Sequence, residues 1–176
     1  MLVGAHSNGT WILMVGVLLV ALGCGSSDDS HQTLSPSDVT NLPAGSAVGT
    51  AFSGVYVLDT STIASCDCRV GSCSMVHGSR GNRLTLTQTD GALNVVLRSN
   101  SPDQIYNGGI DRNGQFLVGS TVLMDTYRSY SLLSGTVVAG VSIDAKSQIT
   151  FVGKATGDDY DCDFTAELAI SYVQPL

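Results

Sequence analysis

Positively charged residues are scarce in this chain of 176 residues, which contains eight Lys and Arg against fifteen Asp and Glu. The formal net charge is therefore −7. A protein that binds nucleic acid needs a basic surface to neutralise phosphates, and the few basic residues here are scattered along the chain. The composition thus argues against nucleic acid as a partner.

Residues that favour helices are also rare. Glu167 is the only glutamate, whereas the chain has 20 glycines and many Ser and Thr. Such a composition disfavours helices and favours strands joined by tight turns. The only tryptophan, Trp11, lies in an N-terminal apolar segment, so the rest of the chain has no Trp on which a sugar could stack.

The sequence motifs of several enzyme classes are missing. The chain has no phosphate-binding Walker loop, no dinucleotide-binding glycine fingerprint and no Gly-x-Ser-x-Gly elbow. His77 is the only histidine after His31, and serine is so abundant that a serine near His77 is weak evidence for a catalytic pair. We therefore expect neither an enzyme nor a bound cofactor.

The longest apolar run is Trp11–Leu22, which ends at Gly23-Cys24-Gly25. Twelve residues fit the core of a secretory signal peptide and fall short of the roughly 20 that a transmembrane helix needs. The residues Ala21-Leu22-Gly23-Cys24, with the polar stretch Gly25–Ser30 behind them, resemble the lipobox of bacterial lipoproteins.

The resemblance to lipoproteins implies a membrane anchor and a location. Residues 1–23 would be the signal peptide, and Cys24 would receive a diacylglyceryl group and become the first residue of the mature protein. Gly25, rather than Asp, is compatible with sorting to the outer membrane in Gram-negative lipoproteins. We expect an exported protein of the cell envelope, in contact with the periplasm. Residues 24–48, rich in Ser, Thr, Asp, Gly and Pro, are expected to form a disordered tether.

Residues 49–176 show the period-2 alternation of strands and are expected to form a single β domain. Asp90-Gly91 and Asn113-Gly114 are typical hairpin turns between alternating segments. A further turn is expected at Ala145-Lys146-Ser147. The expected strands are Phe52–Leu58, Leu84–Gln88, Leu93–Leu97, Gln104–Ile110, Gln115–Met124, Tyr127–Ala139, Val141–Asp144, Ile149–Thr156 and Phe164–Tyr172.

Short connections between successive strands predict an all-β, antiparallel, up-and-down meander of about eight strands. A closed barrel would remove both exposed sheet edges, so we favour it over the alternative, a β-sandwich. Gly54-Val55-Tyr56 is similar to the Gly-x-Trp of lipocalins and related calycin barrels, with Tyr in place of Trp.

Five cysteines are present, and four remain if Cys24 is acylated. An even number in an exported protein predicts two disulfides. A bridge between Cys66 and Cys68 is disfavoured because only one residue separates them. Two pairings remain open: Cys66–Cys73 with Cys68–Cys162, or Cys68–Cys73 with Cys66–Cys162. Both connect the segment from Cys66 to His77, expected to be a loop, with the chain before the last strand.

Two groups of residues raise the alternative of a metal site. Three thiols and the imidazole of His77 lie within twelve residues, but their spacing matches no familiar zinc motif, and an exported protein favours disulfides. Asp159, Asp161 and Asp163 alternate and could face one way, as calcium ligands do. The chain around them lacks the Gly and Glu of the helix-loop calcium motif, so we expect a solvated acidic turn and no metal.

Three functions are compatible with these features. The first is a lipid-anchored binding module that holds a small apolar ligand or a peptide in or at the end of a barrel. The alternative is a structural or protein-interaction lipoprotein of the envelope. An enzyme built around His77 is the third and is disfavoured.

Overall fold

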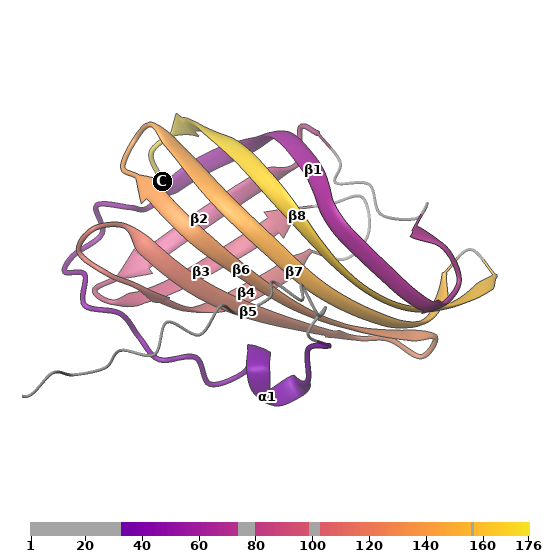
Figure 1. The fold of residues 1–176 in the computed structure, drawn as a ribbon. Coiled ribbons are helices and arrows are strands. Elements are labelled where there is room, and N and C mark those ends of the chain that lie inside the picture. Colours follow the sequence, from indigo (N-terminus) through magenta and orange to yellow (C-terminus); the bar gives the residue numbers. More distant parts are fainter. Residues whose placement is uncertain (1–32, 74–79, 99–102, 156) are drawn as a thin grey trace, which may run out of the picture. The chain divides into compact units, whose positions relative to one another are not determined.

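Eight antiparallel strands follow one another around a closed barrel in a computed structural model of the chain (Figure 1). The structure describes residues 33–73, 80–98, 103–155 and 157–176. The elements are α1 (Pro36–Val39), β1 (Gly54–Val70), β2 (Arg83–Thr89), β3 (Ala92–Arg98), β4 (Gln104–Ile110), β5 (Gln115–Leu123), β6 (Tyr127–Val138), β7 (Ser142–Ala155) and β8 (Asp158–Gln174).

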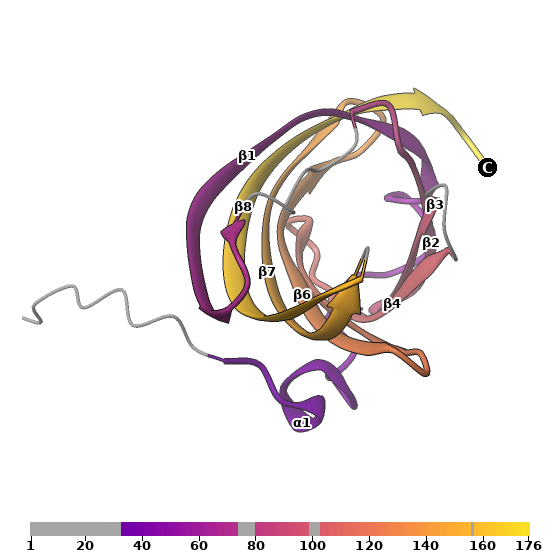
Figure 2. The ribbon, with the colours of Figure 1, turned by 90° about the vertical axis from the view of Figure 1, so that its right-hand side faces the viewer.

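The barrel closes because the last strand, β8, pairs with the first, β1, from Val55 opposite Gln174 to Val70 opposite Asp161. Figure 2 shows the resulting ring of strands, with β8 beside β1. The prediction of an antiparallel up-and-down barrel is confirmed, and the alternative sandwich is wrong. Closure leaves neither edge of the sheet without a partner.

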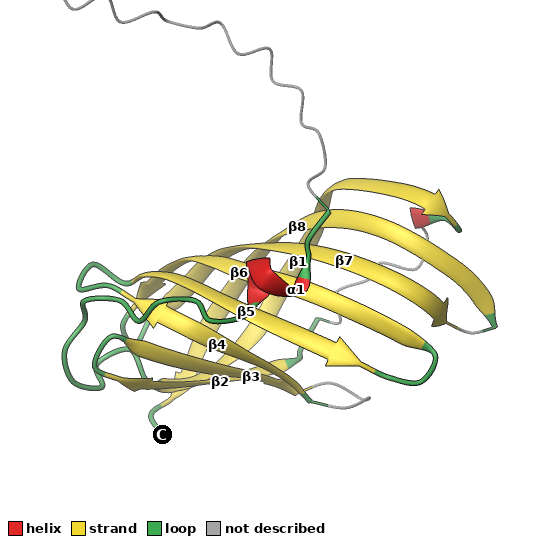
Figure 3. Cartoon of the chain, turned by 90° about the horizontal axis from the view of Figure 1, so that it is seen from below, coloured by secondary structure: helices red, strands yellow, loops and turns green. Residues whose placement is uncertain are grey.

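The strands differ in length, and this difference gives the barrel two unlike ends. β1 and β8 each have 17 residues and β7 has 14, whereas β2, β3 and β4 have 7 each. The long strands extend past the short ones at one end, which we call the long-strand end (Figure 3).

The hydrophobic core fills the part of the barrel away from the long-strand end. Side chains that alternate along each strand meet inside the barrel, and Tyr56, Ile110 and Val118 have no exposed surface. The core cluster consists of Ala47, Tyr56, Leu58, Leu84, Leu86, Leu93, Val95, Tyr106, Ile110, Phe116, Val118, Leu133, Val137, Ile143, Ala145 and Ile170.

Residues 33–53, here called the strap, lie against the barrel before β1 begins, and Ala47 among them belongs to the core cluster. Leu34, Val39 and Ala47 in the strap are buried. The predicted flexible tether over residues 24–48 is therefore wrong for residues 33–48, while residues 24–32 lie outside the described ranges. The reason is that Leu34, Val39 and Ala47, which are spaced among polar residues, are each buried against the barrel.

Two close approaches explain how the strap can pack so tightly. α1 lies over β5 and β6 (Figure 3), where a Cβ on Gly119 would come within 2.1 Å of the Val39 carbonyl oxygen. Further along, the Gly45 N–H donates to the Gly91 carbonyl at 2.8 Å, and a Cβ on Gly91 would collide with the Gly45 backbone. Glycine at positions 91 and 119 therefore makes room for the strap.

One difference from the prediction in the C-terminal half concerns an expected turn. Ala145-Lys146-Ser147, expected to be a turn, lies in the middle of the continuous strand β7. These residues pair with Gly135, Ser134 and Leu133 of β6 on one side and with β8 on the other. Pairing on both sides outweighs the weak strand preference of Ala, Lys and Ser.

Candidate functional site

The inner face of the barrel changes in character toward the long-strand end. Cross-strand partners share a face, so the core residue Leu133 places its partner Ser147 inside, and alternation along β7 then places Ile149 and Phe151 inside as well. Ile149 and Phe151 keep part of their surface exposed, unlike the fully buried Ile143 on the same face of the strand. Apolar packing is therefore less complete at this end.

Three aromatic rings line this end of the inner face. The rings of Tyr127 and Phe151 stack with centroids 5.1 Å apart, and Tyr160 meets Phe151 edge-on at 6.4 Å. They come from β6, β7 and β8, where Tyr160 pairs with Gly153 and Gly153 pairs with Tyr127. Such a group offers both ring faces and ring edges to an apolar molecule.

A set of hydroxyl groups lies on the same inner face, further from the long-strand end than these rings. Ser120 of β5 and Ser131 of β6 are cross-strand partners, and both are buried on the inner face. Ser131 accepts a hydrogen bond from the Gln104 amide at 3.0 Å and also hydrogen-bonds the Tyr106 hydroxyl. By contrast, the Ser120 Oγ has no hydrogen-bond partner in the part of the chain that the structure describes.

The electrostatic environment of these hydroxyls is that of a protein interior. Burial raises the pKa of Tyr106 to about 12, and the hydrogen bond with Ser131 opposes this effect only in part. Tyr106 is therefore a neutral hydrogen-bonding group at any physiological pH. An unpaired buried hydroxyl in such surroundings costs roughly 1–3 kcal/mol.

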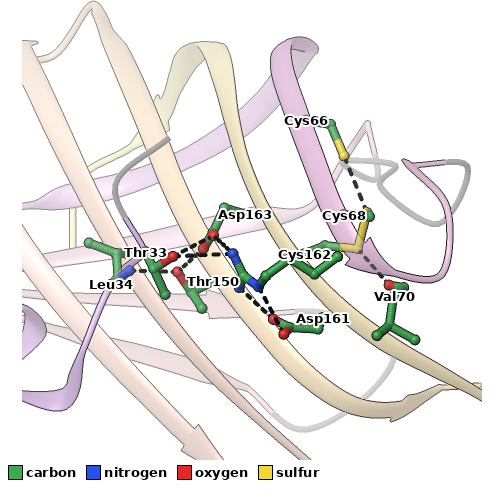
Figure 4. A network of polar contacts seen from close by, with 10 residues as sticks. Thr33, Leu34, Cys66, Cys68, Val70, Thr150, Asp161, Cys162 and Asp163 are labelled. Atoms are coloured by element: carbon green, nitrogen blue, oxygen red, sulfur yellow. Dashed lines mark hydrogen bonds and ion pairs between the residues drawn. A yellow bond between two sulfur atoms is a disulfide. The ribbon is translucent and has the colours of Figure 1, made fainter. Parts of the chain in front are cut away.

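A second polar group lies on the outer face and fastens the strap to the barrel (Figure 4). The Leu34 N–H donates to the Thr150 hydroxyl at 2.7 Å, and Thr150 in turn donates to the Asp163 carboxylate. Thr33 donates to the other oxygen of Asp163 at 2.8 Å. The first described residues of the strap are thus held at β7 and β8 by one carboxylate.

Arg69 of β1 completes this network. Its guanidinium lies 2.9 Å from Asp163 and 2.5 Å from Asp161. Burial acts to raise the pKa of Asp163, but hydrogen bonds from Thr150, Thr33 and Arg69 outweigh it and hold the pKa below its usual value. The hydrogen bonds from Arg69 likewise lower the pKa of Asp161.

The predicted acidic turn is therefore wrong. Asp159, Asp161 and Asp163 lie within β8, and Asp163 is only 3% exposed. Asp161 and Asp163 are engaged by Arg69, and Asp159 lies 3.9 Å from the Lys154 ammonium. Their oxygens serve as acceptors for cations of the protein itself.

The outer face also carries a groove of about 610 Å³. It crosses β1, β8, β7, β6 and β5, and its outward-facing lining is polar. Asp144, Lys146 and Glu167 bring charges of both signs to it. The groove is a candidate surface for a polar or protein partner.

The four cysteines of the barrel form two disulfides, Cys66–Cys73 and Cys68–Cys162. This is the first of the two pairings left open by the sequence. Cys66 and Cys68 lie in β1, so the expectation of a loop from Cys66 is wrong for this part of the segment. Cys24 and His77 lie outside the described ranges.

Comparisons of the chain with protein-family models, with curated proteins and with solved structures returned no match. No helix in the described ranges is both long and apolar enough to cross a membrane.

Sequence reasoning missed the most informative residues of the inner face. Ser120, Ser131 and Gln104 belong to three strands, and nothing in their spacing sets them apart from the many other polar residues of the chain. Alternation along β5 does place Ser120 on the same face as Phe116 and Val118, which is the only signal in the sequence that a hydroxyl enters the core.

Proposed function

We propose that this chain is a lipid-anchored binding module of the cell envelope whose barrel takes a small, mostly apolar molecule at the long-strand end. The observation that carries the proposal is the buried Ser120 hydroxyl, without a partner in the described ranges, on the same inner face as the aromatic rings of Tyr127 and Phe151. The proposed ligand places its apolar body against the rings and one hydrogen-bonding group at Ser120.

The physical reason is that the rings of Tyr127 and Phe151 keep part of their surface exposed, and the Ser120 hydroxyl has no partner in the described ranges. The partly exposed rings gain roughly 25 cal/mol for each Å² of apolar surface that a ligand covers. A donor or acceptor on the ligand relieves the unpaired hydroxyl, which is worth about 1 kcal/mol or more. Such a combination of apolar walls with a few polar groups is typical of small-molecule sites.

The anchor in this proposal is Cys24, acylated as in the lipoproteins that its surroundings resemble. Only residues 25–32 separate Cys24 from Thr33, where the strap joins the barrel. Even a fully extended chain of this length spans only about 30 Å. The barrel would therefore stay within about 30 Å of the bilayer, close to any ligand that leaves or enters the membrane.

Intact-mass analysis of the protein extracted from membranes tests the anchor. We expect loss of residues 1–23, the added mass of two or three acyl chains, and a deficit of four hydrogens from two disulfides. A Cys24→Ser variant should lose the acyl mass and keep residues 1–23, because cleavage follows acylation. An unprocessed chain without acyl groups would contradict the anchor and leave the ligand site to be tested separately.

The ligand site is tested with N-phenyl-1-naphthylamine, an apolar dye that carries one N–H donor. A chain that begins at Gly25 and is exported without a lipidation cysteine should bind the dye with increased fluorescence. Phe151→Ala should weaken binding about tenfold, since an aromatic contact is worth roughly 0.5–1.5 kcal/mol in addition to the apolar area that it buries. Val152→Ala, on the outer face of the same strand, is the matched control and should bind as the parent chain does.

The alternative is an envelope protein that meets a protein partner through its outer surface, and the groove with Asp144, Lys146 and Glu167 is its candidate surface. A photo-crosslinking residue placed at Ser134, in the groove, would then capture a protein in living cells. Failure of the dye to bind, together with capture at Ser134, would favour this alternative.

A further inference from the structure

The two disulfides belong to a single cluster of sulfur atoms at the junction of β1 and β8. The Sγ of Cys68 is bonded to Cys162, and it also lies 3.8 Å from the Sγ of Cys66 and 3.7 Å from that of Cys73. The sulfur atoms of Cys66, Cys68 and Cys73 all lie within 4.8 Å of one another. Three sulfurs thus lie close together, and the fourth, that of Cys162, joins them through its bond to Cys68.

The non-bonded distances in this cluster suit a metal ion. A tetrahedral zinc site with Zn–S bonds of about 2.3 Å places its sulfurs about 3.8 Å apart. The separations of Cys68 from Cys66 and from Cys73 match that value. To complete a tetrahedron, the two bonded pairs must move apart, and Cys162, which does not belong to the group of three, must move toward Cys66 and Cys73.

The backbone holds most of these cysteines in place without the disulfides. Cys68 and Cys162 are direct cross-strand partners, and Cys66 lies two residues earlier in β1, opposite Phe164. β1 and β8 pair along most of their length. Of the four cysteines, only Cys73 lies outside a strand, three residues after the end of β1. Reduction therefore leaves at least three thiols side by side.

We propose that the four thiols, when reduced, form a binding site for one soft divalent cation such as Zn²⁺. Each disulfide takes two electrons and two protons from a dithiol reductant, which is oxidised to its own disulfide. Binding of the cation then releases the four thiol protons to solvent, because thiolates are the ligands. The cation takes the place of both disulfides, and through Cys68 and Cys162 it links β1 with β8.

The inference goes beyond the proposed ligand site and does not depend on it. A chain in a reducing compartment, with the metal bound, keeps the closing strands of the barrel connected. An oxidising compartment replaces the metal by the two disulfides. The same four cysteines thus connect the closing strands in either environment, through the metal or through the disulfides.

Cobalt binding tests the site. The whole chain with Cys24→Ser, so that only the four thiols remain, is purified in detergent, reduced anaerobically with a dithiol and freed of reductant. Titration with Co²⁺ should give one equivalent of bound ion, with thiolate-to-cobalt absorption in the near ultraviolet and the visible bands of tetrahedral cobalt. Stoichiometric Zn²⁺ should remove both signals, and the oxidised chain should give neither.

Two variants show whether all four cysteines take part. Cys162→Ser and Cys73→Ser each remove one ligand and should weaken Zn²⁺ binding by about 100-fold or more, since loss of a mere supporting contact already costs about 10–100-fold. Ser65→Ala in the same strand β1 is the control and should bind as the parent does. Circular dichroism records whether the barrel remains folded.

The proposal is overturned if the reduced chain shows no cobalt–thiolate absorption, whether it is folded or not. It is equally overturned if Cys162→Ser binds Zn²⁺ as tightly as the parent, because binding would then involve only the cysteines near Cys66.

Discussion

Ser120 and Ser131 face each other across β5 and β6 inside the barrel, but only Ser131 has hydrogen-bond partners among the described residues. Ser131 thus takes part in the polar packing of the core, whereas Ser120 is the hydroxyl that the proposed ligand would engage. The two serines also supply a matched pair of variants.

The first prediction concerns this pair. Ser120→Ala removes an unpaired buried hydroxyl, so the free energy of unfolding should stay the same or rise by up to about 1 kcal/mol. Ser131→Ala leaves the Gln104 amide without its acceptor and should lower the free energy of unfolding by about 1–2 kcal/mol. Urea denaturation measures both.

Ser120→Ala should have an effect on ligand affinity that differs from its effect on stability. Ser120→Ala should weaken binding of the naphthylamine dye severalfold, although the protein is no less stable. An unchanged dye affinity in Ser120→Ala would contradict the role given to this hydroxyl.

The second prediction concerns acid stability. Asp161 and Asp163 have pKa values below the ordinary 3.8, so both carboxylates favour the folded state when ionised. Their contribution is complete above the unfolded pKa and is lost as the pH falls through about 4 toward the lower folded values. The free energy of unfolding should therefore hold from pH 7 to pH 5 and then decline steeply.

Arg69→Ala provides the comparison for the acid prediction. Loss of the guanidinium should lower the free energy of unfolding at pH 7 by about 2 kcal/mol, a typical value for hydrogen bonds to a charged group. Because the pKa values of both carboxyls then rise, the decline below pH 5 should be shallower. Parallel pH profiles of the two proteins would argue against this network as the source of the acid sensitivity.

The third prediction concerns the strap. Gly119→Ala places a methyl group where the Val39 carbonyl lies, so α1 should separate from β5. Limited proteolysis should then cleave within residues 33–48, which the parent protects. Leu117→Ala, on the same strand with its side chain exposed, is the control and should leave the strap protected. Equal protection in both variants would contradict the packing described.

The sequence predicted the barrel wherever alternation and turns agreed. The expected strand Gln104–Ile110 has the bounds of β4, because the turn at Asn113-Gly114 marks where this strand must end. The strap escaped prediction because its buried residues, such as Leu34 and Val39, show no periodicity. Their burial comes from contacts with a barrel that the local sequence does not describe.

Long-range partners account for the other differences. Asp163 looked like part of a solvated turn because Arg69, its partner, is 94 residues away. The choice between two disulfide pairings likewise depends on Cys162 lying opposite Cys68, which follows from the register of β1 and β8. Local spacing carries no information about that register.

The central claim is that a small apolar molecule binds inside the barrel at the long-strand end. The most direct test is methyl NMR of the exported chain that begins at Gly25, with labelled isoleucine, during titration with N-phenyl-1-naphthylamine. The account predicts that the methyl resonance of Ile149 shifts, whereas those of Ile170 in the core and Ile105 on the outer face do not. A shift at Ile105 without one at Ile149, or no shift at any isoleucine, would contradict it.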